Sequence, residues 1–367
     1  VWRRSLGDGY SGIAVEDKVL FTAYRDEAHD VVIAVEVESG RTIWETRYSA
    51  PFKNKYAEAV GPGPYAMPQV IGNAVVMASG NGTLRSFNKQ TGTLLWSHDL
   101  YARFNGTKMP FGYSNHPLPY KDKLIVLAGG KGGTLTRITG AGASAVVALK
   151  QSNGEVAWQN LTFDNAHSSP ILINVDGQEQ IVALVAQEVI GFDPANGRLL
   201  WRHPHKTGNG LAASQPVWGA DNILIVSSAY GGGTRALYLR QQAGKTEVRE
   251  LWHNRRIQCL NGTILRINDH AYLSSGQNSP AFVVAFNVRN GDISWQERGF
   301  GKAQLLHADE KFLILDEDGR LAIARATSER VEILDRAPLL DKFAWTPPTL
   351  VGRYLYVRDR KILAKLD

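Results

Sequence analysis

The chain has 367 residues, of which 44% are hydrophobic and 21% charged, a composition that excludes a disordered protein and permits a large buried core. The formal charge of +6 comes from scattered basic pairs such as Arg3-Arg4 rather than from a Lys/Arg block, so nucleic acid is not an expected partner. No apolar run approaches the roughly 18 to 20 residues of a membrane-spanning helix, so we expect no membrane span.

Cysteine usage and the first residues bear on how the chain is processed. Cys259 is the only cysteine, which excludes an intrachain disulfide and any cysteine-based zinc or redox motif. The chain starts at Val1 and Trp2 with neither a methionine nor a signal peptide. We therefore expect that a targeting segment, either a signal peptide or a lipid anchor, has been removed.

A short pattern that ends in tryptophan recurs along the chain. VESGRTIW ends at Trp44, KQTGTLLW at Trp96, QSNGEVAW at Trp158, PANGRLLW at Trp201 and VRNGDISW at Trp295. Two weaker copies end at Trp252 and at Leu334, where leucine replaces the expected tryptophan. From Trp2 onward these anchors lie 39 to 62 residues apart, which centres on the roughly 40 to 50 residues of a four-stranded propeller blade.

Each copy has the same internal order. An alternating apolar strand such as residues 146–149 comes first, a polar turn with Asn-Gly, Ser-Gly or Thr-Gly follows, and a short strand carries the tryptophan. Two more strand-like runs precede each copy, as at residues 123–128. Glycine supplies the positive φ that a tight hairpin requires. The pattern predicts four strands in each unit and no helix anywhere.

The recurring tryptophans have a structural explanation. A lone four-stranded sheet is marginally stable, and stacking such sheets buries both of their apolar faces. A large flat ring near the outer strand fills the gap to the next blade and buries on the order of 200 Å². We interpret seven tryptophans as such inter-blade anchors rather than as catalytic groups: Trp2, Trp44, Trp96, Trp158, Trp201, Trp252 and Trp295.

The two ends of the chain complete an eighth unit. Residues 361–367 resemble the strand just before a turn, and Val1-Trp2 resembles the strand just after it. Pairing these terminal strands closes a ring and removes exposed sheet edges. We predict an all-β fold, a single eight-bladed β-propeller of four-stranded antiparallel blades that spans residues 1–367 as one domain.

The repeat signature, Ala-hydrophobic-x-x-x-x-Gly-x-x-x-Trp, resembles the PQQ-like (pyrroloquinoline-quinone-like) β-propeller repeat over the whole chain. Its clearest copies are residues 192–201 (FDPANGRLLW) and 286–295 (FNVRNGDISW). Quinoprotein alcohol and glucose dehydrogenases share this repeat with the propeller lipoprotein of the bacterial outer-membrane barrel-assembly machinery. The segments 166–173, 228–234 and 345–359 resemble the small bacterial branch of the family.

The resemblance implies a fold more directly than an activity, because function lies in loops added to a shared scaffold. The family's dehydrogenases carry an adjacent Cys-Cys pair and a calcium cluster of Glu, Asn and Asp, and this chain has a single cysteine. We therefore expect no cofactor, no metal site and no catalytic residue. The leading hypothesis is a non-catalytic, periplasmic or secreted scaffold for binding or assembly. The alternative is a small PQQ- and calcium-dependent alcohol or sugar dehydrogenase, and a third, weaker hypothesis is a glycan-binding propeller.

A ligand site is expected where the loops that enter each blade gather around the axis. This ring is polar and aromatic with few acids, which favours an anionic or hydroxyl-rich small ligand, or an acidic peptide segment of a protein partner. We expect the propeller to be a monomer. The candidates are Tyr10, Ser11, Tyr65, Met67, Asn115, His116, His167, Ser168, Gln215, Arg255, Arg256, Asn261, Lys302, Gln304 and Trp345.

Several tempting motifs have simpler explanations. A metal pair at His116 and His167 is one interpretation, but without a nearby carboxylate the sequence favours two histidines bonded to backbone carbonyls or water. Ser168 beside His167 has no Asp to orient it as in a hydrolase. The glycine runs 129–133 and 231–233 fit flexible loops better than phosphate loops. Glu38, Asn153 and Asp193 are expected to cap hairpin turns.

Three long loops break the repeat in blades 1 to 3, at residues 46–66, 98–116 and 129–143. They carry aromatic side chains that we expect to be exposed on one side of the funnel: Phe52, Tyr56, Tyr101, Phe104 and Phe111. Such a rim suits a protein-binding platform, although a lid over a small ligand has the same sequence character.

Overall fold

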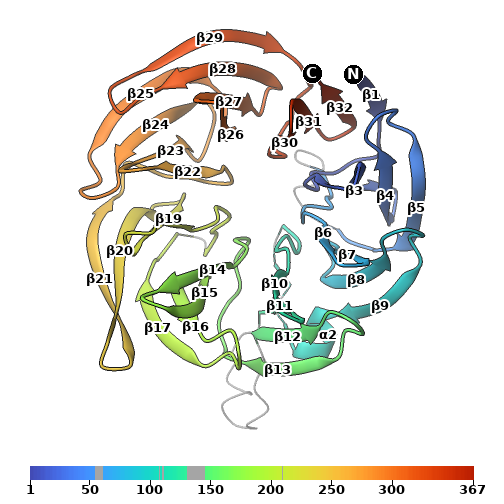
Figure 1. Ribbon diagram of the computed structural model, residues 1–367, viewed down its shortest axis with the longest axis horizontal. Helices are drawn as coiled ribbons and strands as arrows, with labels where there is room; N and C mark the ends of the chain where they lie inside the picture. Colours follow the sequence, from blue (N-terminus) through green and yellow to red (C-terminus); the bar gives the residue numbers. More distant parts are fainter. Residues whose placement is uncertain (54–60, 107, 110, 130–144, 209) are drawn as a thin grey trace. The chain divides into compact units, whose positions relative to one another are not determined.

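The computed structural model describes residues 1–53, 61–106, 108–109, 111–129, 145–208 and 210–367. Over these residues the chain forms eight four-stranded antiparallel sheets, which are the blades of the predicted eight-bladed β-propeller (Figure 1). The chain divides into two compact units, residues 1–165 with 340–367, and residues 166–339. The single domain over residues 1–367 stays a prediction.

The first unit contains blades 8, 1, 2 and 3. Blade 1 consists of β2 (Ala14–Glu16), β3 (Val19–Asp26), β4 (His29–Glu36) and β5 (Thr42–Ser49). Blade 2 consists of β6 (Gln69–Ile71), β7 (Ala74–Ala78), β8 (Thr83–Asn88) and β9 (Leu94–Asp99). Blade 3 consists of β10 (Leu118–Tyr120), β11 (Lys123–Leu127), β12 (Val146–Lys150) and β13 (Val156–Asn160). Blade 8 consists of β30 (Thr349–Val351), β31 (Tyr354–Arg358), β32 (Ile362–Leu366) and β1 (Trp2–Ser5).

The second unit contains blades 4 to 7. Blade 4 consists of β14 (Ile171–Val175), β15 (Gln178–Leu184), β16 (Glu188–Phe192) and β17 (Leu199–Pro204). Blade 5 consists of β18 (Val217–Trp218), β19 (Ile223–Ser228), β20 (Gly233–Gln242) and β21 (Lys245–Asn254). Blade 6 consists of β22 (Ile264–Ile267), β23 (His270–Ser275), β24 (Ala281–Asn287) and β25 (Ile293–Phe300). Blade 7 consists of β26 (Ala303–Ala308), β27 (Lys311–Asp316), β28 (Arg320–Ala326) and β29 (Val331–Pro338).

Blade 8 joins the two ends of the chain. β1 runs antiparallel to β32, with Trp2 opposite Lys365 and Ser5 opposite Ile362. The predicted pairing of the N- and C-terminal strands is therefore confirmed. Because this pairing supplies the fourth strand, β32 does not remain an open edge that could pair with another chain.

Within each unit, the cores lie between successive blades. The middle strands are apolar on both faces, as in β19, because a neighbouring blade covers each face. The outer strands instead alternate between buried and exposed side chains, as in β5, because one of their faces is partly open to solvent. In the first unit a single hydrophobic cluster extends from Phe21 and Ala23 of blade 1 to Val147 and Leu149 of blade 3.

Glycine and tryptophan of the repeat meet across blade boundaries. Four indoles each donate the Nε1–H to a backbone carbonyl in the hairpin turn of the next blade. Three residues after the residue with this carbonyl, a glycine lies against the indole ring. The sets are Trp2 with Val37 and Gly40, Trp44 with Lys89 and Gly92, Trp96 with Gln151 and Gly154, and Trp252 with Val288 and Gly291. These glycines have φ between 71° and 75°, and a Cβ on any of them would lie 2.5 to 2.7 Å from an indole carbon.

Blade 5 departs from this pattern. Its outer hairpin has ten residues in each strand and turns at Gly244, far beyond the repeat position of the glycine. Trp201 therefore donates its Nε1–H to the side chain of Gln180 in its own blade, at 2.7 Å. In the seventh copy of the repeat, where leucine replaces the tryptophan, the Leu334 side chain is 39% exposed.

Turn capping occurs at two of the three expected positions. Asp193 accepts the N–H of Ala195 on Oδ1, and Asn153 accepts the N–H of Glu155 in the same way. Glu38 instead lies 3.5 Å from the Nζ of Lys365.

The expectation of no helix is wrong at one place. α2 (Leu100–Phe104) follows β9, and Asp99 caps its N-terminus by accepting the N–H of Ala102. One side of this helix packs into the core of the first unit, so Tyr101 and Phe104 are 9% and 5% exposed. Their expected exposure on a rim is therefore also wrong, because a helical turn directs both rings inward.

The other three aromatic residues of the long loops were also expected to be exposed. Phe111 is half-buried, and so is Phe52, whose ring lies against Gly80 and Gly112. Tyr56 and residues 130–143 of the third loop lie outside the described residues.

The glycine–tryptophan contact predicts the effect of two matched substitutions. Gly92→Ala and Gly72→Ala both place a side chain at positive φ, which costs about 1 kcal/mol. A Cβ at residue 72 meets nothing within 4 Å, whereas at residue 92 it lies 2.5 Å from the Trp44 ring. We expect Gly92→Ala to lose about 2 kcal/mol more than Gly72→Ala in urea unfolding. Equal losses would show that the ring does not constrain the turn.

Candidate functional site

Four aromatic side chains from three loops of the first unit form a stack, which we call the aromatic platform. Tyr10 precedes β2, Tyr65 precedes β6, and Phe343 and Trp345 precede β30. The Tyr10 ring centroid lies 6.1 Å from that of Tyr65 and 5.1 Å from that of Trp345, and Phe343 lies 4.8 Å from Trp345. Tyr10 is buried and the other three rings are half-buried. The structure thus brings three predicted site residues together and adds Phe343.

Backbone contacts hold the platform loops against one another. Tyr10 donates its backbone N–H to the carbonyl of Pro64 at 2.9 Å, and Thr346 donates its hydroxyl to the Tyr10 carbonyl at 3.1 Å. Ser11, which is fully buried, donates to the carbonyl of Ala66 at 2.8 Å. Met67 packs against Gly12, where a Cβ would lie 2.6 Å from its Cγ. Ser11 and Met67 therefore act between loops of adjacent blades.

A buried guanidinium lies beneath these loops. Arg358, at the end of β31, is fully buried and donates to the carbonyls of Gly9, Ser11 and Ala23 at 2.8 to 3.3 Å. It also donates to the Thr22 hydroxyl at 3.0 Å. Burial lowers the pKa of Arg358 to about 10, so the group remains charged at neutral pH. The Arg358 guanidinium thus fixes the platform loops by donating hydrogen bonds to their backbone carbonyls.

A second arginine lies at the edge of the platform. Arg360 forms an ion pair with Asp8, with Nε 2.9 Å from Oδ1 and both side chains about one-fifth exposed. Burial raises the pKa of the Tyr10 phenol, and the positive charge of Arg360 opposes that shift. The Tyr10 hydroxyl is therefore neutral at physiological pH. Asp8 offsets the charge of Arg360, and the Lys342 ammonium lies over the platform ring of Phe343, 5.2 Å from its centroid.

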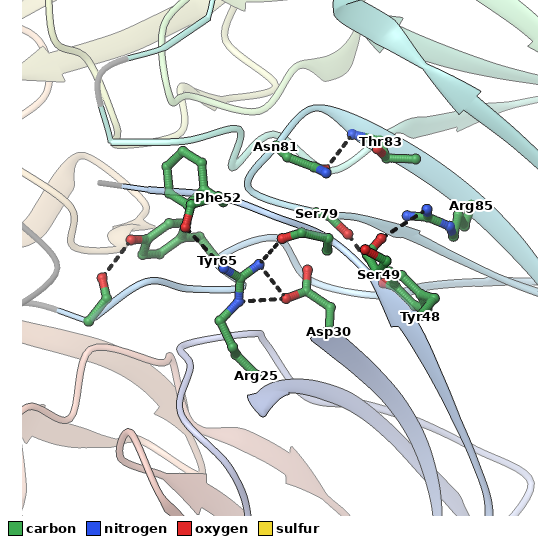
Figure 2. Close-up of polar contacts among 12 residues, drawn as sticks. Arg25, Asp30, Tyr48, Ser49, Phe52, Tyr65, Ser79, Asn81, Thr83 and Arg85 are labelled. Atoms are coloured by element: carbon green, nitrogen blue, oxygen red, sulfur yellow. Dashed lines mark hydrogen bonds and ion pairs between the residues drawn. The ribbon is translucent and has the colours of Figure 1, made fainter. Parts of the chain in front are cut away.

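A buried ion pair fixes the start of the long loop that follows β5. Figure 2 shows the Arg25 guanidinium directed at the Asp30 carboxylate, with Nε and Nη2 2.9 and 2.7 Å from Oδ1. The same guanidinium donates to the carbonyls of Ala50 and Phe52. Burial raises the pKa of Asp30 and the charge of Arg25 opposes the shift. The Arg25 backbone also pairs with that of Asp8, which connects this ion pair to the platform.

The candidates of the second unit hold neighbouring loops together. Gln304 donates its Nε2 to the carbonyl of Asn261 at 3.0 Å, and Gln215 donates to the carbonyl of Pro170 at 3.4 Å. Lys302 lies 3.1 Å from the carboxylate of Glu317, which is 2% exposed. The sequence pattern does not indicate Glu317, because this residue follows β27 rather than preceding the first strand of a blade. Its carboxylate offsets the positive charge expected from Lys302.

The remaining candidates occupy three environments. In the first unit, Asn115 is buried and accepts from Asn165 at 3.0 Å. In the second unit, His167 donates its backbone N–H to the Ala212 carbonyl, and Ser168 is fully buried. Arg255 and Arg256 are exposed on the turn after β21.

The two candidate histidines are neutral groups at physiological pH. Burial lowers the pKa of His116, in the first unit, and of His167, in the second unit, to about 4. Among the described residues, no group of three or more His, Cys, Asp and Glu side chains is arranged to hold a metal ion.

PQQ with calcium does not fit the donor groups of the described residues. A calcium ion requires several oxygen ligands, largely carboxylates. Of the buried or half-buried acids near the predicted loops, Asp8, Asp30 and Glu317 are each engaged by an arginine or a lysine. Asp316 and Asp359 accept hydrogen bonds from backbone N–H groups. An adjacent cysteine pair is impossible in a chain with one cysteine.

Comparison with known protein families identifies the family of this propeller. A family model described as outer membrane protein assembly factor BamB matches residues 1–142 and 72–297, well over half of the chain. The chain belongs to the BamB family. The sequence resemblance to a PQQ-like propeller of the outer-membrane assembly machinery is confirmed.

Curated relatives carry the same name. Outer membrane protein assembly factor BamB of Burkholderia pseudomallei (strain K96243) is 25% identical over 288 residues, 68% of this chain and 70% of that protein. The BamB of Yersinia pestis is 23% identical over 333 residues, 86% of this chain and 75% of that protein.

Solved structures agree on the fold. BamB from Moraxella catarrhalis superposes with a TM-score of 0.66 at 18% identity, over 100% of this chain and 98% of that one. A europium-containing methanol dehydrogenase reaches 0.67 at 11% identity, over 97% and 84% of the two chains. At these identities the likeness shows the fold alone.

The role of Arg358 in this BamB-family chain predicts a large loss of stability on its removal. Arg358→Met keeps much of the side-chain volume but leaves the buried carbonyls of Gly9, Ser11 and Ala23 without their donor. We expect the free energy of unfolding in urea to fall by about 3 to 5 kcal/mol. Arg360→Met, which breaks a partly exposed pair, is the control and should cost about 1 kcal/mol or less. Similar losses in both variants would contradict the assigned role.

The lowered pKa values of the histidines predict a pH dependence. In the unfolded chain a histidine has a pKa of about 6.5, whereas His116 and His167 have folded values of about 4. Between these values the unfolded chain binds more protons, so stability is retained above pH 6.5 and falls as the pH drops toward 4. His205, with a pKa lowered to about 3 by burial, acts in the same direction. The fall between pH 7 and pH 4.5, measured by urea unfolding, should shrink in a His116→Gln/His167→Gln variant, and an undiminished fall would contradict the assignment.

Proposed function

We propose that this chain is an outer-membrane-protein assembly factor that works outside the cytoplasm as a non-catalytic scaffold. The observation that carries the proposal is the family match, which includes both structural units. Both curated relatives reported above are themselves named outer membrane protein assembly factors. Among the described residues, no helix is long and apolar enough to cross a membrane.

The aromatic platform is the proposed contact surface for a protein partner. Tyrosine, tryptophan and arginine are enriched at the energetic centres of protein interfaces, because each combines a large contact area with a polar group. The platform presents half-buried Tyr65 and Trp345 beside the Arg360–Asp8 pair. Its loops are fixed from beneath by Arg358, so a partner would meet a preorganised surface and less conformational entropy would be lost on binding.

The finer form of the proposal assigns binding to the funnel-face loops and the long loops of blades 1 to 3. The Arg25–Asp30 pair supports this assignment, because it holds Ala50 and Phe52 at the start of the first long loop. In this proposal the chain works as a monomer, and an anionic or hydroxyl-rich small ligand is the lesser alternative to a protein at the same loops.

A bacterial strain that lacks its own BamB provides the test of the assembly function. Exported to the periplasm, this chain should restore the amount of folded β-barrel protein in the outer membrane, measured by heat-modifiable mobility on gels. The Tyr65→Ala/Trp345→Ala variant should fold and yet restore much less, because it loses the proposed contact surface. Phe282→Ala, which removes a half-buried ring elsewhere, serves as the matched control.

Two outcomes would contradict the proposal. Failure of the unmodified chain to restore assembly, despite normal export and folding, would remove the assembly function. A melting-temperature increase of the purified protein with PQQ and calcium would favour the dehydrogenase hypothesis instead, since a ligand at 100 times its Kd adds about 2.7 kcal/mol of stability.

A further inference from the structure

The extended hairpin of blade 5 borders a cavity that the platform does not use. Tyr238 and Arg240 of β20, with Glu247 and Arg249 of β21, line an open cavity of about 280 Å³. The strands place these residues on one face, because Tyr238 pairs with Arg249 and Arg240 with Glu247. All four belong to the second unit and to the described residues.

The opposite face of the hairpin is already covered. Leu239 and Val248 pack into the core shared with blade 4, and Gln180 of that blade donates to the Thr246 hydroxyl at 2.7 Å. The backbone N–H of Gln241 donates to the Asp176 carboxylate of blade 4 at 2.8 Å. These contacts fix one face of the hairpin. On the other face, half-buried Tyr238 packs at the edge of the core shared with blade 6, and Arg249 is exposed.

The charges within the cavity are unequal. Arg240 is paired with Glu247, its Nε lying 2.6 Å from the carboxylate. The Arg249 guanidinium instead lies over the Tyr238 ring, 5.5 Å from its centroid. Among the described residues, no carboxylate lies within ion-pair distance of Arg249, and its side chain is exposed. The cavity thus has one excess positive charge, supported on an aromatic ring.

We propose that this cavity is a second binding site, which docks an acidic peptide segment of a partner protein. A single carboxylate of the segment pairs with the fork of Arg249, since guanidinium and carboxylate match in a bidentate geometry. An adjacent apolar or aromatic side chain of the segment packs beside Tyr238. The site is independent of the aromatic platform and of the proposed assembly function.

The cavity favours a peptide over a polyanion for two reasons. Glu247 lies inside it and repels a second anionic group, which disfavours nucleic acid or a densely anionic lipid surface. Its volume accommodates one or two side chains. The exposed arginine on a tyrosine is the combination found at the energetic centres of protein interfaces.

Fluorescence anisotropy with a defined probe tests the site. The probe is a labelled heptapeptide with one acidic side chain, Ser-Gly-Glu-Phe-Gly-Gly-Ser, and its matched form carries glutamine at the glutamate position. We expect the acidic peptide to bind the full chain in 50 mM NaCl, the glutamine form to bind at least tenfold more weakly, and 300 mM NaCl to weaken the acidic peptide severalfold. Arg249→Glu should weaken binding of the acidic peptide more than tenfold.

Controls separate this site from a general charge effect. Arg298→Glu reverses another exposed arginine that lies over an aromatic ring, Phe282, and should leave peptide binding unchanged. Unfolding in urea establishes that both variants remain folded. No binding by the unmodified chain up to millimolar peptide, equal binding of both peptides, or equal losses in both variants would each overturn the proposal. Binding of phosphatidylglycerol vesicles in place of the peptide, abolished by Arg249→Glu, would assign the cavity to lipid and overturn it as well.

Discussion

The contact between an indole of one blade and a glycine of the next is the constraint on which the repeated structure depends. The indole N–H donates to a turn carbonyl, and the ring occupies the space where a Cβ of the glycine would stand. The glycine and the tryptophan of one repeat therefore contact different neighbours. The tryptophan contacts the following blade, and the glycine is contacted by the tryptophan of the preceding blade. Because the glycine of each of these four contacts holds its turn at positive φ, the four hairpins keep one geometry, while the loops at the other ends of the strands remain free to vary.

The functional loops depend on a different kind of interaction, in which buried arginines bind backbone carbonyls. Arg358 does this beneath Tyr10, and Arg25 does it at the start of the long loop after β5. Irregular loops carry carbonyl groups that no strand partner satisfies, and a guanidinium with five donors satisfies several at once. A rigid aromatic platform is therefore compatible with loops that break the repeat. Many of the polar side chains expected to face a ligand, such as Ser11 and Gln304, contribute to the same task between neighbouring loops.

Fold and site differed in how well the sequence predicts them. Periodic glycine and tryptophan, with alternating strands, were sufficient for eight blades and for the pairing of β1 with β32, because these features repeat. The helix at Leu100–Phe104 was missed because five residues carry too little periodicity, and its inward turn buries Tyr101 and Phe104. Tyr10, Tyr65 and Trp345 were found from their position before a first strand. The sequence does not indicate three other residues, because their partners come from long-range packing and no local sequence pattern reveals that packing. These residues are Phe343, Arg358 and Glu317.

Site-specific photocrosslinking in cells tests the central claim most directly, that the aromatic platform contacts a protein of outer-membrane assembly. A photoreactive phenylalanine analogue would replace Tyr65 in one variant and Phe282 in another, and crosslinked partners would be identified by mass spectrometry. We predict a discrete crosslink from position 65 to a protein of the outer-membrane assembly machinery and none to that protein from position 282. Crosslinks that are the same from both positions, or no protein crosslink from position 65, would contradict the claim.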